Sequence, residues 1–334
     1  MTKHAYDVLG IGTPIVDQVI FSTHEIVSAI SGTPGGSETV DYFTFLDLLE
    51  ASKAEPLVIP GGSAANTIKG LAFLGKSCRI FGKIGKDKAG QAFMDAMQSA
   101  GVTTKLLESR QPTAQVACLI TPDNERTMRS YLGAGIEMNA DELTPELFQS
   151  VKIVHIEGYL LDRIGFVKRA MHLAKEAGAT VSFDLASYEM VIKHKRQMVD
   201  LIAQYVDILF ANEQETQTLT GLPPERGCSI LKDLCTIAIV KAGAAGCWVS
   251  DGGACFHQPA IIPHQIVDTT GAGDFFASGF LYGCLEEEDP PTCALFAAIV
   301  ASHAIAVVGT ELSPETWYQI NKELKSRKMQ HLAG

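Results

Sequence analysis

The chain has 334 residues and a formal net charge of −11, because 27 lysines and arginines stand against 38 aspartates and glutamates. Hydrophobic residues make up 46% of the chain and charged residues 19%, which excludes a predominantly disordered protein. An acidic chain without a block of basic residues lacks the charge that duplex nucleic acid or an anionic membrane attracts. We therefore expect a globular protein that holds any anionic ligand by a local device, such as a helix terminus.

From the cysteines and the N-terminal segment we do not expect a secreted protein. Eight cysteines are spread along the chain without a CxxC pair, so we expect reduced, buried thiols and a cytoplasmic protein. Asp7 and Asp17 interrupt any signal-peptide core. The charge-free stretch 290–310 is long enough to span a membrane, but it opens with two prolines and is rich in alanine. We interpret it as a buried helix.

In chain order, short apolar runs alternate with helical patterns. Strands are predicted at 6–12, 78–85, 152–158, 180–185, 207–212 and 236–243, and helices after residues 62, 87 and 164. Strands that are apolar on both faces and alternate with helices are typical of a parallel sheet covered on both sides. The predicted fold is a doubly wound, Rossmann-like α/β sheet in one domain covering residues 1–334.

Two regions interrupt this alternation. Residues 15–60 contain a strand-like run, a glycine- and proline-rich segment and a short amphipathic helix. Residues 113–133 contain two alternating runs separated by a Pro-Asp-Asn turn, which indicates a hairpin. We expect these inserted segments to form a small β-rich lid, which would exclude water from a reaction.

One motif is misleading. Residues 70–77 match the phosphate-binding pattern GxxxxGK[ST] letter for letter. That loop requires a strand before it and a helix after it. Here the residues LAFL inside the motif end a helical run and a strand follows, so Gly75 is expected to cap a helix. We therefore assign no phosphate site to residues 70–77, and a P-loop ATPase becomes a weak alternative.

The strongest motif is the segment 268–274, DTTGAGD, which leads directly into a helical run. Gly271, Ala272 and Gly273 would open the helix and leave unpaired N–H groups at its positive end, which suits a transferring phosphoryl group. A carboxylate at Asp274 could accept the proton of an attacking hydroxyl. The alternative is an ordinary glycine turn in which the aspartate caps the helix.

Two further segments could supply ligands for hydroxyl groups. In 60–66, PGGSAAN, Gly62 permits a close backbone approach and Asn66 offers an amide. In 10–17, GIGTPIVD, Asp17 follows the first strand. A carboxylate and an amide together suit vicinal hydroxyls, although Asp17 could also be a solvated charge on an edge strand.

These motifs, together with GKIGKDKAG at 82–90 and NEQE at 212–215, occur in an order that resembles the PfkB carbohydrate kinases, also called ribokinase-like, from about residue 6 to residue 310. The resemblance implies ATP- and Mg²⁺-dependent phosphorylation of a hydroxymethyl group on a sugar or nucleoside. It makes Asp274 the catalytic base and Gly271, Ala272 and Gly273 the anion hole. It makes Asp17, Gly62 and Asn66 ligands of the substrate hydroxyls.

The resemblance also implies a nucleotide side. Asn212 and Glu215 correspond to the residues that organise Mg²⁺ and the phosphates. The nucleotide-binding loop would comprise Lys241, Gly243 and Gly246, although Lys241 replaces the usual threonine. Ala301 and Ala304 would leave room for the adenine ring. A monovalent cation such as K⁺ would lie beside the glycine turn, near Asp268 and Thr270.

The lid segments favour one branch of this family. The long stretch between Asp17 and Gly62, the run GGSAANTIK and the run ERTMRSYLGA at 125–134 are similar to adenosine kinases. Arg126 falls where that branch places a lid arginine that reaches the phosphates, although Arg126 and Arg129 could also form a solvated hairpin face. Adenosine, phosphorylated to AMP, is the expected acceptor. A sugar kinase resembling ribokinase, fructokinase or ketodeoxygluconate kinase is the alternative, and a non-catalytic ligand sensor is a more distant one. We expect a small-molecule partner, no nucleic acid or membrane, and a monomer or homodimer.

Overall fold

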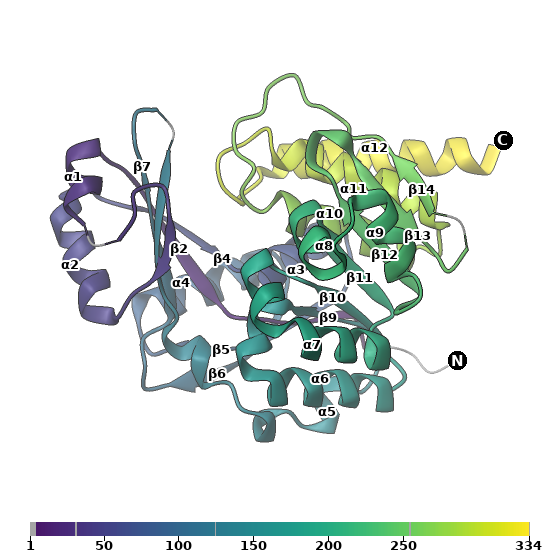
Figure 1. Ribbon diagram of the computed structural model, residues 1–334, viewed down its shortest axis with the longest axis horizontal. Helices are drawn as coiled ribbons and strands as arrows, with labels where there is room; N and C mark the ends of the chain where they lie inside the picture. Colours follow the sequence, from purple (N-terminus) through teal and green to yellow (C-terminus); the bar gives the residue numbers. More distant parts are fainter. Residues whose placement is uncertain (1–4, 31, 124, 254, 334) are drawn as a thin grey trace.

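The computed structural model of the protein describes residues 5–30, 32–123, 125–253 and 255–333. Two β-sheets organise it, a large one packed between helices and a smaller one that projects to one side (Figure 1). The large sheet has the order β14 (Cys255–Gln258), β13 (Cys247–Ser250), β12 (Ile237–Lys241), β11 (Ile208–Asn212), β10 (Thr180–Asp184), β9 (Val151–Glu157), β1 (Tyr6–Ile11), β5 (Cys78–Gly85) and β6 (Thr103–Ser109).

The strands from β12 to β6 are parallel, and β13 and β14 are added antiparallel at one edge. This confirms the predicted doubly wound α/β fold. All six predicted strands are present, whereas β6, β13 and β14 were not predicted. The sequence order reverses between β9 and β1, and in open α/β sheets such a switch point is where ligands bind.

Helices cover both faces of the large sheet. One face carries α3 (Ser63–Phe73), α4 (Lys88–Ser99), α10 (Ala272–Leu285), α11 (Pro290–Ala304) and α12 (Pro314–Ala333). The other carries α5 (Pro145–Phe148), α6 (Ile164–Glu176), α7 (Tyr188–Tyr205), α8 (Glu213–Thr220) and α9 (Pro224–Leu231). Val8 packs on the first face and its neighbours Leu9 and Ile11 on the second, so both faces of β1 are buried in apolar cores.

The charge-free stretch forms α11, as expected for a buried helix. Its side chains pack against α10 and α12 in the first core. Among the described residues no helix has both the length and the apolar character needed to cross a membrane.

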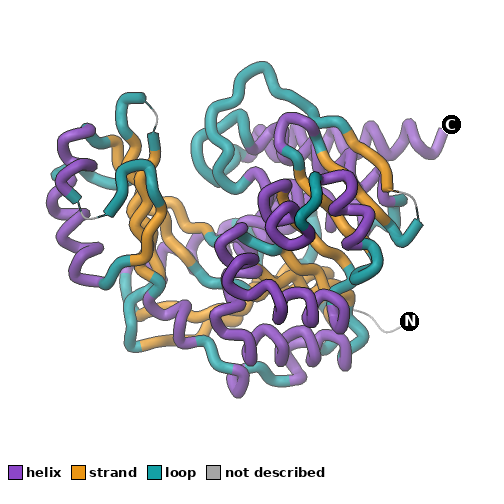
Figure 2. Tube along the Cα trace, viewed as in Figure 1, coloured by secondary structure: helices purple, strands orange, loops and turns teal. Residues whose placement is uncertain are grey.

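The smaller sheet forms the lid, whose strands run separately from those of the large sheet (Figure 2). Its order is β3 (Ser37–Thr39), β8 (Arg126–Tyr131), β7 (Ala114–Ile120), β2 (Ile15–Phe21) and β4 (Leu57–Gly61). The helices α1 (His24–Ala29) and α2 (Tyr42–Ser52) pack on its outer face around Phe45 and Leu119. Its inner face is left open toward the carboxyl ends of the large sheet.

Candidate active site

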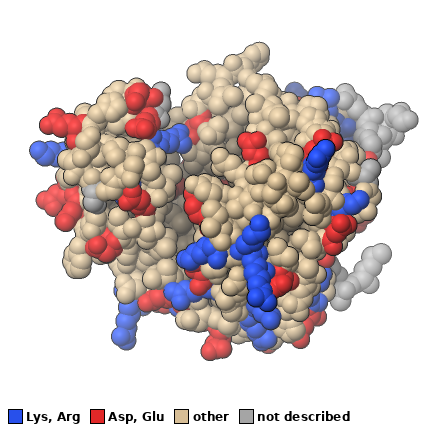
Figure 3. All heavy atoms as spheres, in the orientation of Figure 1, with Lys and Arg blue, Asp and Glu red and all other residues tan. Residues whose placement is uncertain are grey.

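A cavity of about 1310 Å³ lies between the lid and the carboxyl ends of the parallel strands. The space-filling view shows the hollow between the two parts of the molecule (Figure 3). Its walls come from the inner face of the lid, the ends of β10 to β12, the 3₁₀ helix that follows β9, and the first turns of α3 and α10. The sheet therefore gathers side chains from distant parts of the sequence at its switch point.

The glycine turn opens α10 as the sequence predicts. Gly271 is the residue before the helix, with φ +71°, and no side chain caps the helix. A Cβ on Gly271 would lie 2.6 Å from Thr310 Cγ2, so a larger residue would be both strained and crowded. Residues 271–274 line the cavity, and the positive end of the α10 dipole therefore faces it.

Asp274 is not the cap of its helix. It lies in the first turn of α10, and its carboxylate accepts hydrogen bonds from Ser63 Oγ at 2.8 Å and Asn66 Nδ2 at 3.0 Å. Ser63 and Asn66 are three residues apart on α3, so both point from one helix face toward Asp274. Burial raises the pKa of Asp274 to about 7, although the two hydrogen bonds act in the opposite direction. A carboxylate with a pKa near 7 is well matched to a proton acceptor at neutral pH.

Asp17 and Asn66 face one small space. Asn66 Oδ1 and Asp17 Oδ2 lie 3.4 Å and 3.6 Å from the point where a Cβ on Gly61 would stand. Asn66 Oδ1 is buried without a hydrogen-bond partner among the described residues. Asp17 lies on β2, between β7 and β4, so it is not an edge-strand charge, and burial raises its pKa to about 6. Two oxygen acceptors thus converge where ligand hydroxyls could donate.

Gly62 permits the approach between the lid and α3. It has φ +106°, and a Cβ there would lie 2.5 Å from the carbonyl oxygen of Thr13. Glu157, at the end of β9, closes the same corner by accepting from the backbone N–H groups of Thr13 at 2.7 Å and Ala64 at 2.9 Å. Burial raises the pKa of Glu157 to about 7 despite these hydrogen bonds. This carboxylate ties the start of α3 to the segment that leads into the lid.

Asn212 and Glu215 form a capping box at the start of α8. Glu215 accepts from the Asn212 N–H at 2.7 Å and from Asn212 Nδ2 at 2.6 Å, while Asn212 Oδ1 accepts from the Glu215 N–H at 2.8 Å. Glu215 is 2% exposed, and burial followed by the charge of Asp184 raises its pKa. The spacing of the two residues therefore has a structural role, while both line the cavity.

Lys241 ends β12 beside the glycine turn. Its ammonium pairs with Asp184 Oδ2 at 2.8 Å, and its Nζ is 3.1 Å from the position that a Cβ on Gly273 would occupy. Burial lowers the pKa of this ammonium, but the charges of Asp184, Glu215 and Asp274 raise it above its ordinary value overall. The lysine is therefore a cation held at the positive end of α10.

The far end of the cavity suits a flat, apolar group. Its lining includes Ala301 and the glycines Gly243 and Gly246, with Ala298, Ser302, Ile305, Ile262 and Ile266. Ala304 differs from the sequence expectation, because it is 1% exposed and packs in the core rather than lining the cavity. Residues 298, 301, 302 and 305 share one face of α11, and Ala304 lies about 110° from the middle of that face.

The model of the pfkB family carbohydrate kinases matches residues 50–317, which is most of the chain. This chain belongs to the pfkB family. As a family member it is an ATP-dependent kinase of sugars or nucleosides.

The proteins similar to this pfkB kinase include kinases named for sugars and kinases named for nucleosides. A 5-dehydro-2-deoxygluconokinase from Clostridium botulinum (strain Alaska E43 / Type E3) is 26% identical, over 81% of this chain and 85% of its own. A probable sugar kinase from Rhizobium etli CFN 42 has a TM-score of 0.87 and 28% identity, over 96% of this chain and 99% of its own. An adenosine kinase from Sinorhizobium meliloti has a TM-score of 0.86 and 29% identity, over 95% and 99%.

In this pfkB kinase, Arg126 contacts the glycine turn from the lid. Its guanidinium pairs with Asp268 Oδ1 at 2.8 Å and donates to Thr270 Oγ1 at 2.5 Å. Asp268 also accepts from the N–H groups of Thr270 at 2.8 Å and Gly309 at 2.9 Å. Arg126 is therefore not a solvated hairpin charge, and it links β8 to the segment before α10. Arg129 is 1% exposed and donates to backbone carbonyls within the lid.

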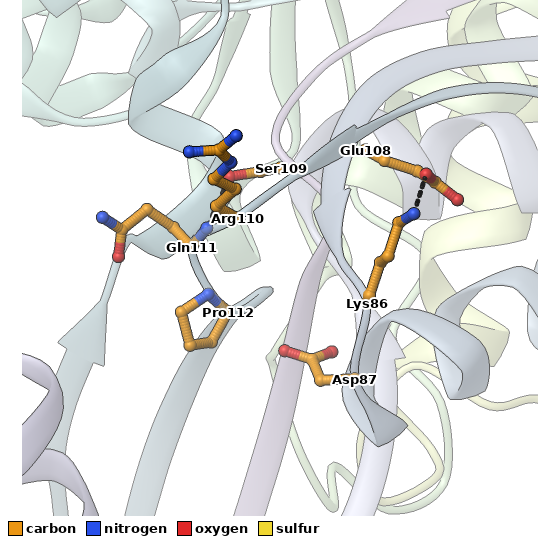
Figure 4. Close-up of a pocket in the computed structure, with 7 residues that line it drawn as sticks. All are labelled: Lys86, Asp87, Glu108, Ser109, Arg110, Gln111 and Pro112. Carbon is orange, nitrogen blue, oxygen red and sulfur yellow. Dashed lines mark hydrogen bonds and ion pairs between the residues drawn. The ribbon is translucent and has the colours of Figure 1, made fainter.

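The misleading motif lies outside the cavity. Helix α3 ends at Phe73 and β5 begins at Cys78, so the order of helix and strand is the reverse of a P-loop. Lys76 pairs with Glu286, beyond the end of α3, and its Nζ is 4.9 Å from the centre of the Tyr282 ring. A smaller cavity of about 480 Å³ between the β5–α4 turn and the end of β6 contains the exposed pair Lys86–Glu108 at 2.8 Å (Figure 4). It shares no lining residue with the large cavity.

Sequence reasoning assigned no function to three residues that line or brace the site. Glu157 and Asp184 are the last residues of β9 and β10, and Ser63 stands inside the GGSAAN motif. The signal for the two acids was their position, because carboxyl ends of parallel strands point to one edge of the sheet. Ser63 could be assigned only when α3 and α10 were seen side by side.

Proposed function

We propose that this pfkB kinase transfers the γ-phosphoryl group of ATP to the hydroxymethyl group of a nucleoside, with adenosine as the preferred acceptor. The observation that carries the proposal is the chemistry of the inner lid face. One row across the lid sheet contains Asp17, Val116, Ser130 and Thr39, which are paired in register. Ile15, Met128 and Ser37 extend this face along the strands, and all seven residues line the cavity.

This face suits a ribose attached to an apolar base. Asp17 would accept hydrogen bonds from the sugar hydroxyls, together with Asn66 and the backbone at Gly62. Ile15, Val116 and Met128 would pack on the base, joined by Leu132, Ile136 and Tyr159, which also line the cavity. No lysine or arginine belongs to the lid residues that line the cavity in the described part of the chain. An acid or a phosphorylated sugar would need such a cation.

The transfer would take place between Asp274 and the first turn of α10. Asp274 accepts the hydroxyl proton as the acceptor oxygen bonds to the γ-phosphorus, and the bond from that phosphorus to the β,γ-bridging oxygen breaks. ADP leaves with the electron pair of that bond. The N–H groups of residues 271–273 stabilise the negative charge on the phosphoryl oxygens. Asp274 then returns its proton to water.

The fit of Mg²⁺ to the site can be judged from its oxygen donors. Each oxygen of Glu215 accepts a single hydrogen bond and so keeps a lone pair, and this ion prefers one or two carboxylates plus substrate phosphates. We therefore assign Mg²⁺, bound with ATP, to Glu215 and Asn212, where it would neutralise charge on the phosphates. Among the described residues, no group of three His, Cys, Asp or Glu side chains could hold a metal alone.

The residues considered for K⁺ fit that ion poorly. Asp268 Oδ1 accepts from the Thr270 N–H and pairs with Arg126, and the Thr270 hydroxyl accepts from the same guanidinium. The positive charge beside the turn is that of the arginine. We therefore include no step through a monovalent cation.

A sugar-acid kinase is the second candidate. Arg163 ends the 3₁₀ helix Gly158–Arg163 and lines the cavity, so it could bind a carboxylate. The 26% identical relative from Clostridium botulinum is named for such an acid. The two candidates differ in which substrate contact carries specificity.

The test is an ADP-release assay with adenosine, inosine, ribose, fructose and ketodeoxygluconate. We expect adenosine to exceed every free sugar at least tenfold in kcat/KM, a difference of only ~1.4 kcal/mol. Arg163→Gln should leave the adenosine reaction within about threefold, whereas it should abolish the reaction of a sugar acid. Turnover of a sugar or sugar acid without activity on any nucleoside would overturn the proposal.

A further inference from the structure

Lys241 differs from Lys69 and Lys83, the two buried lysines among the described residues. Lys69 and Lys83 each satisfy two acceptors: Lys69 donates to Pro60 O at 2.9 Å and to Glu311, and Lys83 donates to Glu137 O at 3.0 Å and to Glu142. Among the described residues, the Lys241 ammonium has one hydrogen-bond acceptor, Asp184 Oδ2. Its side chain is 17% exposed. An ammonium has three donors, so two remain for a ligand.

The spare donors lie next to the anion site. Lys241 Nζ is 3.1 Å from the point above Gly273 where a Cβ would stand, and Gly273 belongs to the first turn of α10. A side chain at residue 273 would therefore meet the ammonium. The absence of one leaves open the space between the lysine and the positive end of the helix. Lys241 and the turn line the same cavity.

Lys241 is a cation in a site where carboxylates predominate. Asp184, Glu215 and Asp274 are the carboxylates whose charges act on Lys241, and His155 adds no positive charge at neutral pH because burial lowers its pKa to about 4. The chain carries a net charge of −11. Lys241 and Arg163 are the only basic side chains in the cavity lining of the described residues. A triphosphate needs such a local cation to enter a site that is otherwise acidic.

We propose that Lys241 binds the γ-phosphoryl group of ATP and stays on it during transfer, and that Asp184 is a positioning residue that holds the lysine there. Asp184 suits this role because its other carboxylate oxygen accepts from the Ala186 N–H at 2.9 Å, which fixes the carboxylate at the end of β10. Lys241 makes and breaks no covalent bond and keeps its protons. This inference rests on the proposed transfer at α10 but not on the identity of the acceptor.

The test compares nucleotide binding with turnover in Lys241→Met and, as a second variant that keeps a polar side chain, Lys241→Gln. By calorimetry, affinity for a β,γ-imido analogue of ATP should fall at least tenfold, whereas affinity for ADP should change less than threefold. The kcat, measured with whichever acceptor the wild-type enzyme uses best, should fall about 10²- to 10³-fold, as for other lost oxyanion contacts. Acceptor KM should stay within threefold.

Three matched variants separate a phosphate contact from a structural ion pair. Lys241→Arg keeps the positive charge and should recover kcat to within about tenfold of wild type. Asp184→Asn should lower kcat and the affinity for the imido analogue together, again sparing ADP. Lys175→Met removes a similar pair, Lys175–Asp207 at 2.8 Å, from the amino-terminal ends of the strands, and should change neither quantity more than twofold.

The outcomes are distinguishable. The inference is overturned if folded Lys241→Met or Lys241→Gln retains kcat within threefold of wild type, or if ADP affinity falls as much as that of the imido analogue. A wild-type enzyme that phosphorylates a sugar but no nucleoside refutes the proposed acceptor and leaves this test intact. Thermal unfolding of every variant checks that the comparison is made on folded protein.

Discussion

At the scale of single residues, the pKa values of the carboxylic acids near the cavity depend on burial more than on residue type. Asp274, Asp17 and Glu157 are ordinary carboxylic acids, yet burial raises their pKa values to about 7, 6 and 7. Asp268, which accepts two backbone hydrogen bonds and pairs with Arg126, has a lowered pKa although burial acts the other way. The pKa values of Asp274 and Asp17, which line the cavity, and of Glu157, which braces its corner, thus differ from that of Asp268 because their surroundings differ.

Asp274→Asn should remove most phosphoryl transfer while nucleotide binding persists. The substitution keeps the size of the side chain and removes the proton acceptor, and losses of a general base are typically ~10²–10⁴-fold in rate. Stopped assays give kcat, and calorimetry with ADP gives binding. Asp95→Asn, at an exposed position of α4, is the matched control. A fall in kcat of less than fivefold would mean that another group accepts the proton.

The pH dependence of the wild-type enzyme follows from the same residue. A base must be deprotonated to act, so kcat/KM should decrease as pH falls through about 7, the pKa of Asp274. Below about 6, protonation of Asp17 should weaken acceptor binding further. A pH–rate profile from 5 to 9 measures both. A profile that stays flat down to pH 5 would contradict these assignments.

At the scale of elements, two glycine-containing segments that both suggest a phosphate site, 268–274 and 70–77, lie at opposite ends of their helices. The turn at 268–274 leads into a helix and presents N–H groups to the cavity. The motif at 70–77 instead contains the last turn of α3, where the carbonyl groups of the helix are exposed. The direction of the helix relative to the motif therefore decides which one can hold phosphate.

Gly271→Val and Lys76→Ala test this difference directly. Gly271→Val places a β-branched residue at φ +71° and 2.6 Å from Thr310 Cγ2, so it should abolish transfer. Lys76→Ala removes only the contacts with Glu286 and Tyr282 and should leave kcat and ATP affinity within about twofold, at a stability loss of up to about 1 kcal/mol. A folded Lys76→Ala protein that no longer binds ATP would refute the assignment of the nucleotide site.

At the scale of the whole molecule, the site exists only where the lid meets the large sheet. Asp17 comes from the lid, Asn66 from α3 and Asp274 from α10. Along the chain, Asn66 lies 49 residues after Asp17, and Asp274 lies 208 residues after Asn66. Arg126 and Glu157 brace this meeting point from its two sides. Movement of the lid would therefore alter substrate binding and the anion turn together.

Arg126→Ala should weaken this coupling. It leaves the buried Asp268 without its cation, and a hydrogen bond to a charged group is worth about 1.5 kcal/mol or more, so kcat/KM should fall on the order of tenfold. Hydrogen exchange should rise in β8 and in the segment before α10. Arg110→Ala, on the exposed rim of the smaller cavity, is the control. If hydrogen exchange and activity are unchanged in Arg126→Ala, the arginine does not couple the lid to the segment before α10.

The fold class and the positions of most motifs follow from local patterns in the sequence. Strands such as 207–212 are apolar on both faces, and helices follow them at regular distances. Both patterns are local in the sequence, and a parallel sheet covered by helices on both faces requires them. The strands at the edges of the large sheet were harder to predict. β6 is largely polar, and β13 and β14 have four residues each, so none of the three shows a clear hydrophobic period. Which functional groups come into contact depends on the tertiary fold. The pairing of Lys241 with Asp184, the orphan oxygen of Asn66, the position of Ala304 and the contact of Arg126 with Asp268 all depend on distances between segments far apart in sequence. No periodicity encodes such distances, because they are set by how the strand order and the lid bring the chain together.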